Sequence, residues 1–318
     1  MATTDPSGLD IDVSDLSSER AAAWFRQTPV RRDFSRLDDA DFGTWPDGFE
    51  LAGRWLGLRA YHRGCYRGAI AARIHRDGTA DVLPPSCHGR FDPQLATALL
   101  EHAATQLGVR RVQLAISYLP IDATAIHACA RSVRFQRTGD LLVLTRSVGG
   151  DDVSPQLGDW TFEPCALGER DDLPAVLQRT LIGSRDFPNL PQVGSIQAML
   201  ERFAEVGLGD DRMWYLARYR RNLAGCLLMT ARGDCQIGEL LYFGLVPEYR
   251  GRGGGRCMVR YALDTAGDRG LPAVIAGVDA ENDPAIAIYA SMGFDPVSRR
   301  GVFFRRLATG GDVSPYAT

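Results

Sequence analysis

A run of glycines and arginines, set between an apolar strand-like run and a helix-like run, is the segment of this sequence best suited to chemistry. It reads Leu245-Val246-Pro247-Glu248-Tyr249-Arg250-Gly251-Arg252-Gly253-Gly254-Gly255-Arg256. Glycines accept unusual φ angles, so several backbone N–H groups can converge on one anion at the positive end of a helix. Arginine side chains add charge-assisted hydrogen bonds to phosphate oxygens. The segment predicts a loop that binds a phosphate chain, although a plain tight turn explains the glycines alone equally well.

Two common phosphate-binding motifs are excluded. The Walker loop requires a lysine, and all 36 basic residues of this chain are arginines. The dinucleotide fingerprint requires a third glycine, whereas Gly255 is followed by Arg256, Cys257 and Met258. The remaining pattern is Arg-x-x-Gly-x-Gly, formed by Arg250, Gly253 and Gly255.

A second pattern lies further downstream. It reads Asn282-Asp283-Pro284-Ala285-Ile286-Ala287-Ile288-Tyr289 and is followed by Gly293-Phe294. The two patterns, in this order, resemble the coenzyme loop and the N-x-x-A-x-x-(apolar)-Y-x-x-x-G-F signature of the GNAT acetyltransferases. The resemblance implies that acetyl-CoA is the acyl donor and that a primary amine attacks the thioester directly. No metal site is expected, because the cysteines show no metal-binding spacing and the adjacent Cys87 and His88 read as an incidental loop pair.

The resemblance also implies roles for individual residues. Tyr289 would be the general acid that protonates the leaving thiolate, and Glu239 the base, acting directly or through water. A backbone N–H near Leu245 or Val246 would polarise the thioester carbonyl. Contacts with the coenzyme are implied for Leu245, Val246, Arg250, Gly251, Arg252, Gly253, Gly254, Gly255, Arg256 and Asn282. Structural alternatives stay open: an aromatic packed on the sheet for Tyr289, a helix cap for Asn282 and a solvated carboxylate for Glu239.

Acceptor choice is predicted to reside in the turn-rich segment from Gly183 to Gly194, with Asp186 and Asn189 as its polar candidates. In this family the two helices on either side of such a segment border the acceptor cleft. We expect a small-molecule amine rather than a protein as acceptor, and a homodimer stays open. The competing hypothesis is a non-catalytic acyl-CoA sensor or scaffold.

The elements that must position these residues follow from the apolar spacing of the second half. Helices are predicted at 170–182, 194–206, 254–269 and 284–291, and strands at 213–219, 223–231, 237–246, 273–278 and 302–307. Short polar connections between the first three strands predict antiparallel hairpins. The expected fold class is mixed α/β, with a mostly antiparallel sheet flanked by helices.

The first half shows a similar order of elements, which suggests an internal repeat. Helices are predicted at 94–107 and 122–131 and strands at 112–117 and 141–145. Where the second half has its glycine loop, the first has Pro84-Pro85-Ser86-Cys87-His88-Gly89-Arg90, whose prolines lack N–H donors. Aligning Phe135 with Phe294 places Ala130 at the position of Tyr289. The sequence therefore predicts tandem GNAT-like domains, of which the first is degenerate and binds no coenzyme.

Composition sets the domain boundaries and excludes several classes of protein. We expect a disordered tail over 1–13, a degenerate domain over 14–146, a linker over 147–158, a catalytic domain over 159–308 and a tail over 309–318. A net charge of -3 argues against a general nucleic-acid binder. No run reaches membrane-spanning length, so a cytoplasmic location is expected. The seven cysteines form no C-x-x-C pair and are expected to be free buried thiols.

Overall fold

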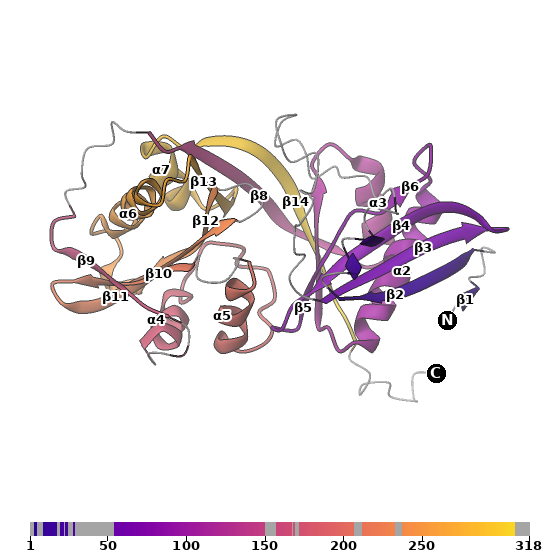
Figure 1. Ribbon diagram of the computed structural model, residues 1–318, viewed down its shortest axis with the longest axis horizontal. Helices are drawn as coiled ribbons and strands as arrows, with labels where there is room; N and C mark the ends of the chain where they lie inside the picture. The colour runs from indigo at the N-terminus through magenta and orange to yellow at the C-terminus, as the bar shows by residue number, and fades with distance from the viewer. Residues whose placement is uncertain are drawn as a thin grey trace. The chain divides into compact units, whose positions relative to one another are not determined.

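The computed structural model divides into two compact units (Figure 1). Unit 1 comprises Met1–Gly139, Asn189–Gly194 and Arg300–Thr318, and unit 2 comprises Asp140–Pro188 and Ser195–Arg299. The residues that the structure describes are 3–4, 9–17, 20–21, 23–24, 28, 54–149, 157–166, 168, 172–206, 212–232 and 237–308. Among these, no helix combines the length and apolar character needed to cross a membrane.

Unit 1 contains a sheet against which helices α2 and α3 pack. Its elements are β1 (Thr3–Thr4), β2 (Asp10–Leu16), β3 (Arg54–His62), β4 (Cys65–Ile74), β5 (Thr79–Val82), β6 (Ser86–Cys87), α2 (Pro93–Val109), β7 (Leu114–Pro120) and α3 (Thr124–Ser132). The strands pair in the order β1-β2-β3-β4-β5-β7, antiparallel except for β5 with β7, and β6 pairs with β4. The apolar stripe of α2, including Leu95, Leu99 and Leu107, is buried in the core.

Unit 2 holds the segment with the predicted chemistry. Its elements are β8 (Gln136–Ser147), β9 (Trp160–Pro164), α4 (Asp172–Thr180), α5 (Ile196–Ala204), β10 (Arg212–Tyr219), β11 (Asn222–Arg232), β12 (Ile237–Leu245), the 3-10 helix η1 (Pro247–Tyr249), α6 (Gly254–Asp268), β13 (Ala273–Asp279) and α7 (Asp283–Ser291). The strands pair in the order β8-β13-β12-β11-β10-β9. Helices α6 and α7 pack on one face of this sheet, and α4 and α5 on the other.

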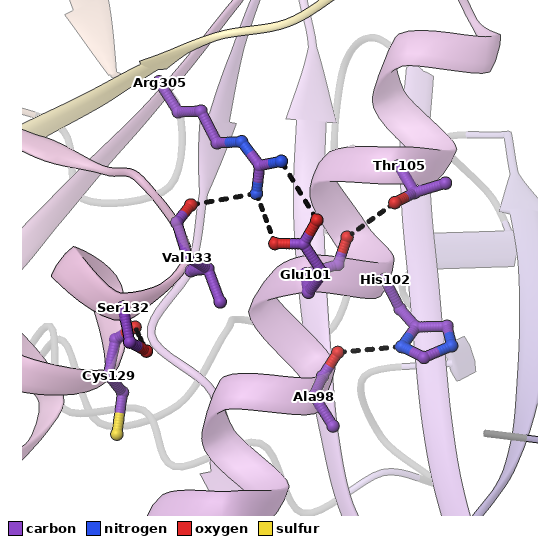
Figure 2. Close-up of polar contacts among 8 residues, drawn as sticks. All are labelled: Ala98, Glu101, His102, Thr105, Cys129, Ser132, Val133 and Arg305. Carbon is purple, nitrogen blue, oxygen red and sulfur yellow. Dashed lines mark hydrogen bonds and ion pairs between the residues drawn. The ribbon is translucent and has the colours of Figure 1, made fainter. Parts of the chain in front are cut away.

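The last strand of each half of the sequence belongs to the sheet of the other half. Residues 141–147 of β8 pair with β13 in unit 2, and residues 300–306 of β14 (Asp295–Arg306) pair with β7 in unit 1. Figure 2 shows the contacts of Arg305 on β14 with unit 1. Its guanidinium donates hydrogen bonds to the carboxylate of Glu101 on α2 and to the carbonyl of Val133. The units therefore differ in their final strands from the division at 147–158 expected from the sequence.

The mixed α/β class and the mostly antiparallel pairing are confirmed. Among the described strands, the parallel pairs are β5 with β7 in unit 1 and β12 with β13 in unit 2. The expected disordered tail over 1–13 is wrong from Asp10 onward, because β2 begins there and pairs with β3. Leu9, Ile11 and Val13 alternate with polar residues, a strand-like pattern that sequence reasoning missed, and Ile11 is fully buried. Residues 309–318 and most of the expected linker lie outside the described residues.

The internal repeat is visible in the backbone after α3 and α7. Arg134 (φ 64°) and Gly293 (φ 75°) both adopt a left-handed conformation directly before a phenylalanine. Phe135 donates its N–H to the carbonyl of Ala130 at 3.0 Å, and Phe294 donates to Tyr289 at 3.1 Å. The two helices thus end in the same way, and Ala130 stands where Tyr289 stands.

Candidate active site

The parallel pair β12 and β13 separates to form a wedge in the sheet of unit 2. The two strands pair over Gly238–Leu240 and Val274–Ala276, whereas β12 continues to Leu245 and β13 to Asp279. A strand whose neighbour has moved away leaves backbone N–H and C=O groups available to a ligand. The glycine-rich loop follows directly after the separated end of β12.

The ladder between β12 and β11 shows which backbone groups face the wedge. Val246 donates its N–H to the carbonyl of Ala224 at 2.9 Å, and Leu245 lies opposite Gly225. In an antiparallel ladder this makes Leu245–Gly225 a non-hydrogen-bonded pair, so the N–H of Leu245 points away from β11. The N–H of Val246 is therefore not available to polarise the thioester. Its other predicted contacts with the coenzyme stay predictions.

Sequence reasoning missed Phe243, which lies two residues before Leu245 on β12 and has the same backbone orientation. It lies opposite Leu227, two residues from the Leu245–Gly225 pair on each strand, so its backbone also faces the wedge. A β-bulge between Leu228 and Met229 shifts the register just before this point. The shift was not recoverable from apolar alternation, because a bulge adds a residue without changing composition.

The glycine loop has the geometry of an anion-binding helix start. Gly251 (φ 74°) and Gly253 (φ 78°) are left-handed, and α6 begins after Gly253 without a side-chain cap from the described residues. The next two glycines serve close packing: a Cβ at Gly254 would overlap the ring of Trp160, and one at Gly255 would lie 2.6 Å from Ile288 of α7. The first turn of α6 thus keeps backbone N–H groups that no side chain caps.

The arginines of the loop have different surroundings. The guanidinium of Arg250 donates to the carbonyls of Leu245, Thr180, Ile182 and Gly183, at distances from 2.7 to 3.2 Å. It thereby ties the C-terminal end of α4 to the loop. Arg252 lies over the rings of Tyr219 and Tyr249, and Arg256 is exposed on the first turn of α6. The phosphate contacts of these three side chains stay predictions.

Tyr289 lies at the wedge with its ring packed in the core. Its side chain is 3% exposed, and its ring meets Phe243 and Phe294 edge-on at 5.8 and 5.1 Å between centroids. Burial, and after it the charge of Asp186, raises the pKa of the Tyr289 phenol well above its usual value. The phenol therefore stays protonated at neutral pH, as a general acid must before it donates. The core packing and the acid role are compatible, because the ring makes the packing contacts and the hydroxyl would donate the proton.

Asn282 caps α7, which supports the structural alternative raised from the sequence. Its side-chain oxygen accepts from the N–H of Ala285 at 3.4 Å. Its side chain also hydrogen-bonds Asp186, in the segment predicted to choose the acceptor. That segment is divided between the units: Gly183–Pro188 belongs to unit 2 and Asn189–Gly194 to unit 1.

Glu239 stands at the closed end of the wedge. It lies opposite Ile275 in the short parallel pairing, and its carboxylate is 3.4 Å from Arg232. Phe243 lies four positions further along β12, roughly 13 Å away if the strand is extended. Of the two routes expected for this base, the distance favours the one through water.

Comparison with known proteins follows the same residues. The acetyltransferase (GNAT) family model matches residues 184–294, which contain the wedge, the glycine loop and Tyr289. A mycothiol acetyltransferase of Catenulispora acidiphila is 36% identical over 120 residues, covering 36% of this chain and 38% of that protein. One from Acidothermus cellulolyticus is 28% identical over 304 residues, covering 83% of this chain and 87% of that protein. The domain that contains residues 184–294 belongs to the GNAT family of acetyltransferases.

Solved structures of GNAT proteins share the fold. A GCN5-related N-acetyltransferase from Sphaerobacter thermophilus has a TM-score of 0.65 at 15% identity, covering 93% of this chain and 95% of that one. A tandem GNAT protein from the clavulanic acid biosynthesis pathway has a TM-score of 0.59 at 14% identity, covering 93% and 98%. The tandem arrangement expected from the sequence is therefore found in a solved GNAT protein.

The backbone at the site of this GNAT domain has features suited to coenzyme A. The left-handed glycines, the uncapped start of α6 and the outward-facing backbone of β12 are suited to a diphosphate followed by an amide-containing arm. Within the described residues, no group of three or more side chains is placed to hold a metal ion. None of the described cysteines forms a disulfide, but only Cys129 and Cys226 are buried as expected. Cys65 is exposed, since it follows the tight turn at Arg63–Gly64, and Cys87, Cys165 and Cys257 are half-buried.

Proposed function

We propose that this protein transfers the acetyl group of acetyl-CoA to a small primary amine in the wedge between β12 and β13. The observation that carries the proposal is that three features lie together around strand β12. These are the outward-facing backbone of Phe243 and Leu245, the uncapped start of α6, and the buried phenol of Tyr289 beside Phe243.

In this proposal the diphosphate of the coenzyme binds the glycine loop, and the pantetheine arm extends along the exposed edge of β12. The N–H of Leu245 or Phe243 polarises the thioester carbonyl, because both point away from β11. Left-handed Gly251 and Gly253 allow the loop to curve so that its N–H groups face the phosphates.

The transfer needs one bond to form and one to break. A neutral amine nitrogen attacks the thioester carbonyl, a C–N bond forms, the C–S bond breaks, and the thiolate takes the phenolic proton of Tyr289. The nitrogen loses a proton to water, and we assign Glu239 as the final proton acceptor through a water chain. The Tyr289 phenolate then recovers a proton from solvent. The products are an acetamide and free coenzyme A.

The N-terminal half has a different part in the proposal. Asp92 caps α2 by accepting from the N–H groups of Gln94 and Leu95, and Pro93 at the helix start has no N–H. An incoming phosphate would compete with this internal carboxylate. We assign this half a supporting role without a coenzyme of its own.

The acceptor class is suggested by relatives. Those that match here are named mycothiol acetyltransferases, so an amine from mycothiol chemistry is the first acceptor to test. The test is to follow thioester loss from acetyl-CoA with a panel of amines that includes glucosamine, cysteamine and L-cysteine derivatives. Turnover with at least one amine supports the proposal. Calorimetric binding of acetyl-CoA without turnover of any amine supports the sensor hypothesis instead.

Glu239→Gln provides the matching test of the base. The variant keeps the size of the side chain and a hydrogen-bond acceptor for Arg232. We expect turnover to fall while coenzyme affinity is unchanged. Wild-type turnover in this variant removes Glu239 from the proton path and leaves the transferase proposal intact.

A further inference from the structure

Two carboxylates meet at the end of β13 without a cation beside them. The N–H of Asp279 donates to Asp186 at 2.9 Å, and Asp279 accepts from the N–H groups of Phe187 at 2.9 Å and Glu281 at 3.0 Å. Asp279 is 3% exposed. In the described part of the chain, neither carboxylate forms an ion pair with an arginine or histidine.

The negative charge of these two carboxylates is not balanced by a cation of the described residues. Carboxylates removed from water are normally compensated by a cation, because backbone N–H groups offset only part of the desolvation cost. Burial, and also the charge of Asp279, raises the pKa of Asp186, while the N–H of Asp279 and the side chain of Asn282 act in the opposite direction. A positive charge placed here would be stabilised by both carboxylates.

The position is accessible to a ligand. Asp186 as a residue is exposed, although protein atoms surround its carboxylate. The carboxylate lies at the end of β13, where the sheet has already separated from β12.

A separate observation relates this pair of carboxylates to the reacting centre. The phenol of Tyr289, on a side chain 3% exposed, makes no hydrogen bond to any described residue. The charge of Asp186 acts on this phenol and on that of Tyr242. The two phenols differ, because Tyr242 is held by Thr180 at 2.8 Å. The unpartnered hydroxyl therefore belongs to the tyrosine that the transfer needs, within the electrostatic reach of the unpaired carboxylate.

We propose that Asp186 and Asp279 form a subsite that binds the ammonium group of the acceptor, which restricts acceptors to primary amines that are cationic at neutral pH. This rests on the proposed function. An ammonium group offers three N–H donors around a compact charge and matches the lone pairs that two carboxylates leave available. The bound ammonium first loses one proton to water, the neutral nitrogen attacks, and the second proton leaves the nitrogen by the path given above. Neutral alcohols lack the positive charge and quaternary amines lack the N–H donors, so both are excluded.

Asp186→Asn is the variant that tests the subsite. Asparagine keeps the size of the side chain and an oxygen that can accept from Asp279. We expect kcat/KM for the best amine of the panel to fall roughly 100-fold, mainly through KM, because a buried charge loses its partner. Coenzyme A affinity should be unchanged, and the melting temperature of the free protein should stay equal or rise. Glu281→Gln is the control, since this neighbouring exposed carboxylate contributes only its backbone to the network.

A second measurement does not depend on turnover. Propylammonium chloride should raise the melting temperature of the wild-type protein above that in sodium chloride of equal ionic strength, and should not do so for Asp186→Asn. Wild-type kcat/KM in the variant overturns the subsite and leaves the transferase standing. A lowered melting temperature with equal losses for all amines shows a purely structural role and also overturns it. If no amine is turned over but the propylammonium shift is present and lost in the variant, the subsite stands and the transferase function fails.

Discussion

Helices α2 and α6 occupy equivalent places in the two halves of the repeat, yet their N-termini are capped differently. At α2 the carboxylate of Asp92 accepts from two backbone N–H groups, and Pro93 removes a third donor. At α6 the preceding residue is left-handed Gly253, and no described side chain caps the helix. The positive end of a helix is satisfied by an internal anion in one half and left for an external anion in the other.

The helices that follow differ in the same sense. Ala130 in α3 is fully buried and carries no functional group, whereas Tyr289 in α7 brings a phenol to the wedge. Both precede a turn with the same left-handed backbone conformation. The two halves therefore share this part of the fold but differ in the side chain that it positions. The comparison separates what the repeat needs to fold from what one copy needs to act.

The largest expected effect comes from removing that phenol. Tyr289→Phe keeps the edge contacts with Phe243 and Phe294 and deletes the hydroxyl, so kcat should fall by about 10²- to 10⁴-fold. Coenzyme affinity should be unchanged. Steady-state kinetics with the true acceptor and calorimetry with coenzyme A measure the two quantities. Tyr261→Phe, which leaves a ring stacked on Phe162, is the control and should keep full turnover. Near-complete turnover of Tyr289→Phe would show that another group protonates the thiolate.

A smaller effect is expected at the start of α6. Gly253→Val forces a β-branched residue into a left-handed conformation and should reshape the loop, weakening coenzyme binding by roughly 10- to 100-fold at about 1–2 kcal/mol of strain. Gly270→Val is a matched control, because Gly270 is also left-handed (φ 69°), has open space around it and lies at the other end of α6. The control should lose similar stability and no affinity. Equal affinity in both variants by calorimetry contradicts the phosphate-binding assignment.

The corresponding change in the first half should affect stability alone. Asp92→Ala removes the cap of α2 and should cost about 1 kcal/mol in the free energy of unfolding, measured by urea denaturation. Asp92→Asn keeps an acceptor oxygen and should cost less. Both variants should bind one coenzyme A per chain, as the wild type should, because Pro93 still lacks an N–H. Two coenzymes per chain in any of the three proteins would mean that the first half has its own site.

The smallest effect concerns the exchanged strand. Arg305 donates to both oxygens of Glu101, at 2.6 and 3.0 Å (Figure 2), and this holds the pKa of Glu101 below the ordinary value of 4.5. Glu101 is 47% exposed, so solvent screens the pair and Arg305→Met should cost about 1 kcal/mol or less.

The pH dependence of that cost has a defined sign. A depressed carboxyl pKa stabilises the fold at pH values above the unfolded pKa, and the contribution is lost as the pH falls through the folded pKa. The stability difference between wild type and Arg305→Met should therefore be present at pH 7 and narrow below about pH 4. Arg306→Met, at an exposed neighbouring position, should show no such convergence. A difference that widens in acid would exclude the ion pair as its source.

Most helices and strands of the second half could be predicted because their signals are local. The helix predicted at 254–269 is observed at Gly254–Asp268, and the strand at 273–278 at Ala273–Asp279. Strands β8 and β14 were predicted too short, since their polar and turn-like beginnings at Gln136 and Asp295 depend on partners distant in sequence. Asp279 was missed as a site residue, because a carboxylate after a buried strand has meaning only when its neighbours are known.

The sequence by itself determined the glycine loop, the tyrosine signature and the loss of both in the first half, because these depend on residue type and short spacing. Backbone conformations such as those of Gly251 and Gly253 follow from the absence of a Cβ and need no distant partner. Only the tertiary structure decided that the two halves exchange their final strands, that Leu245 rather than Val246 turns its N–H to the wedge, and that Asp186 meets Asp279 without a cation. Each of these depends on strand register or on contacts between segments far apart in the chain, which composition and spacing do not specify.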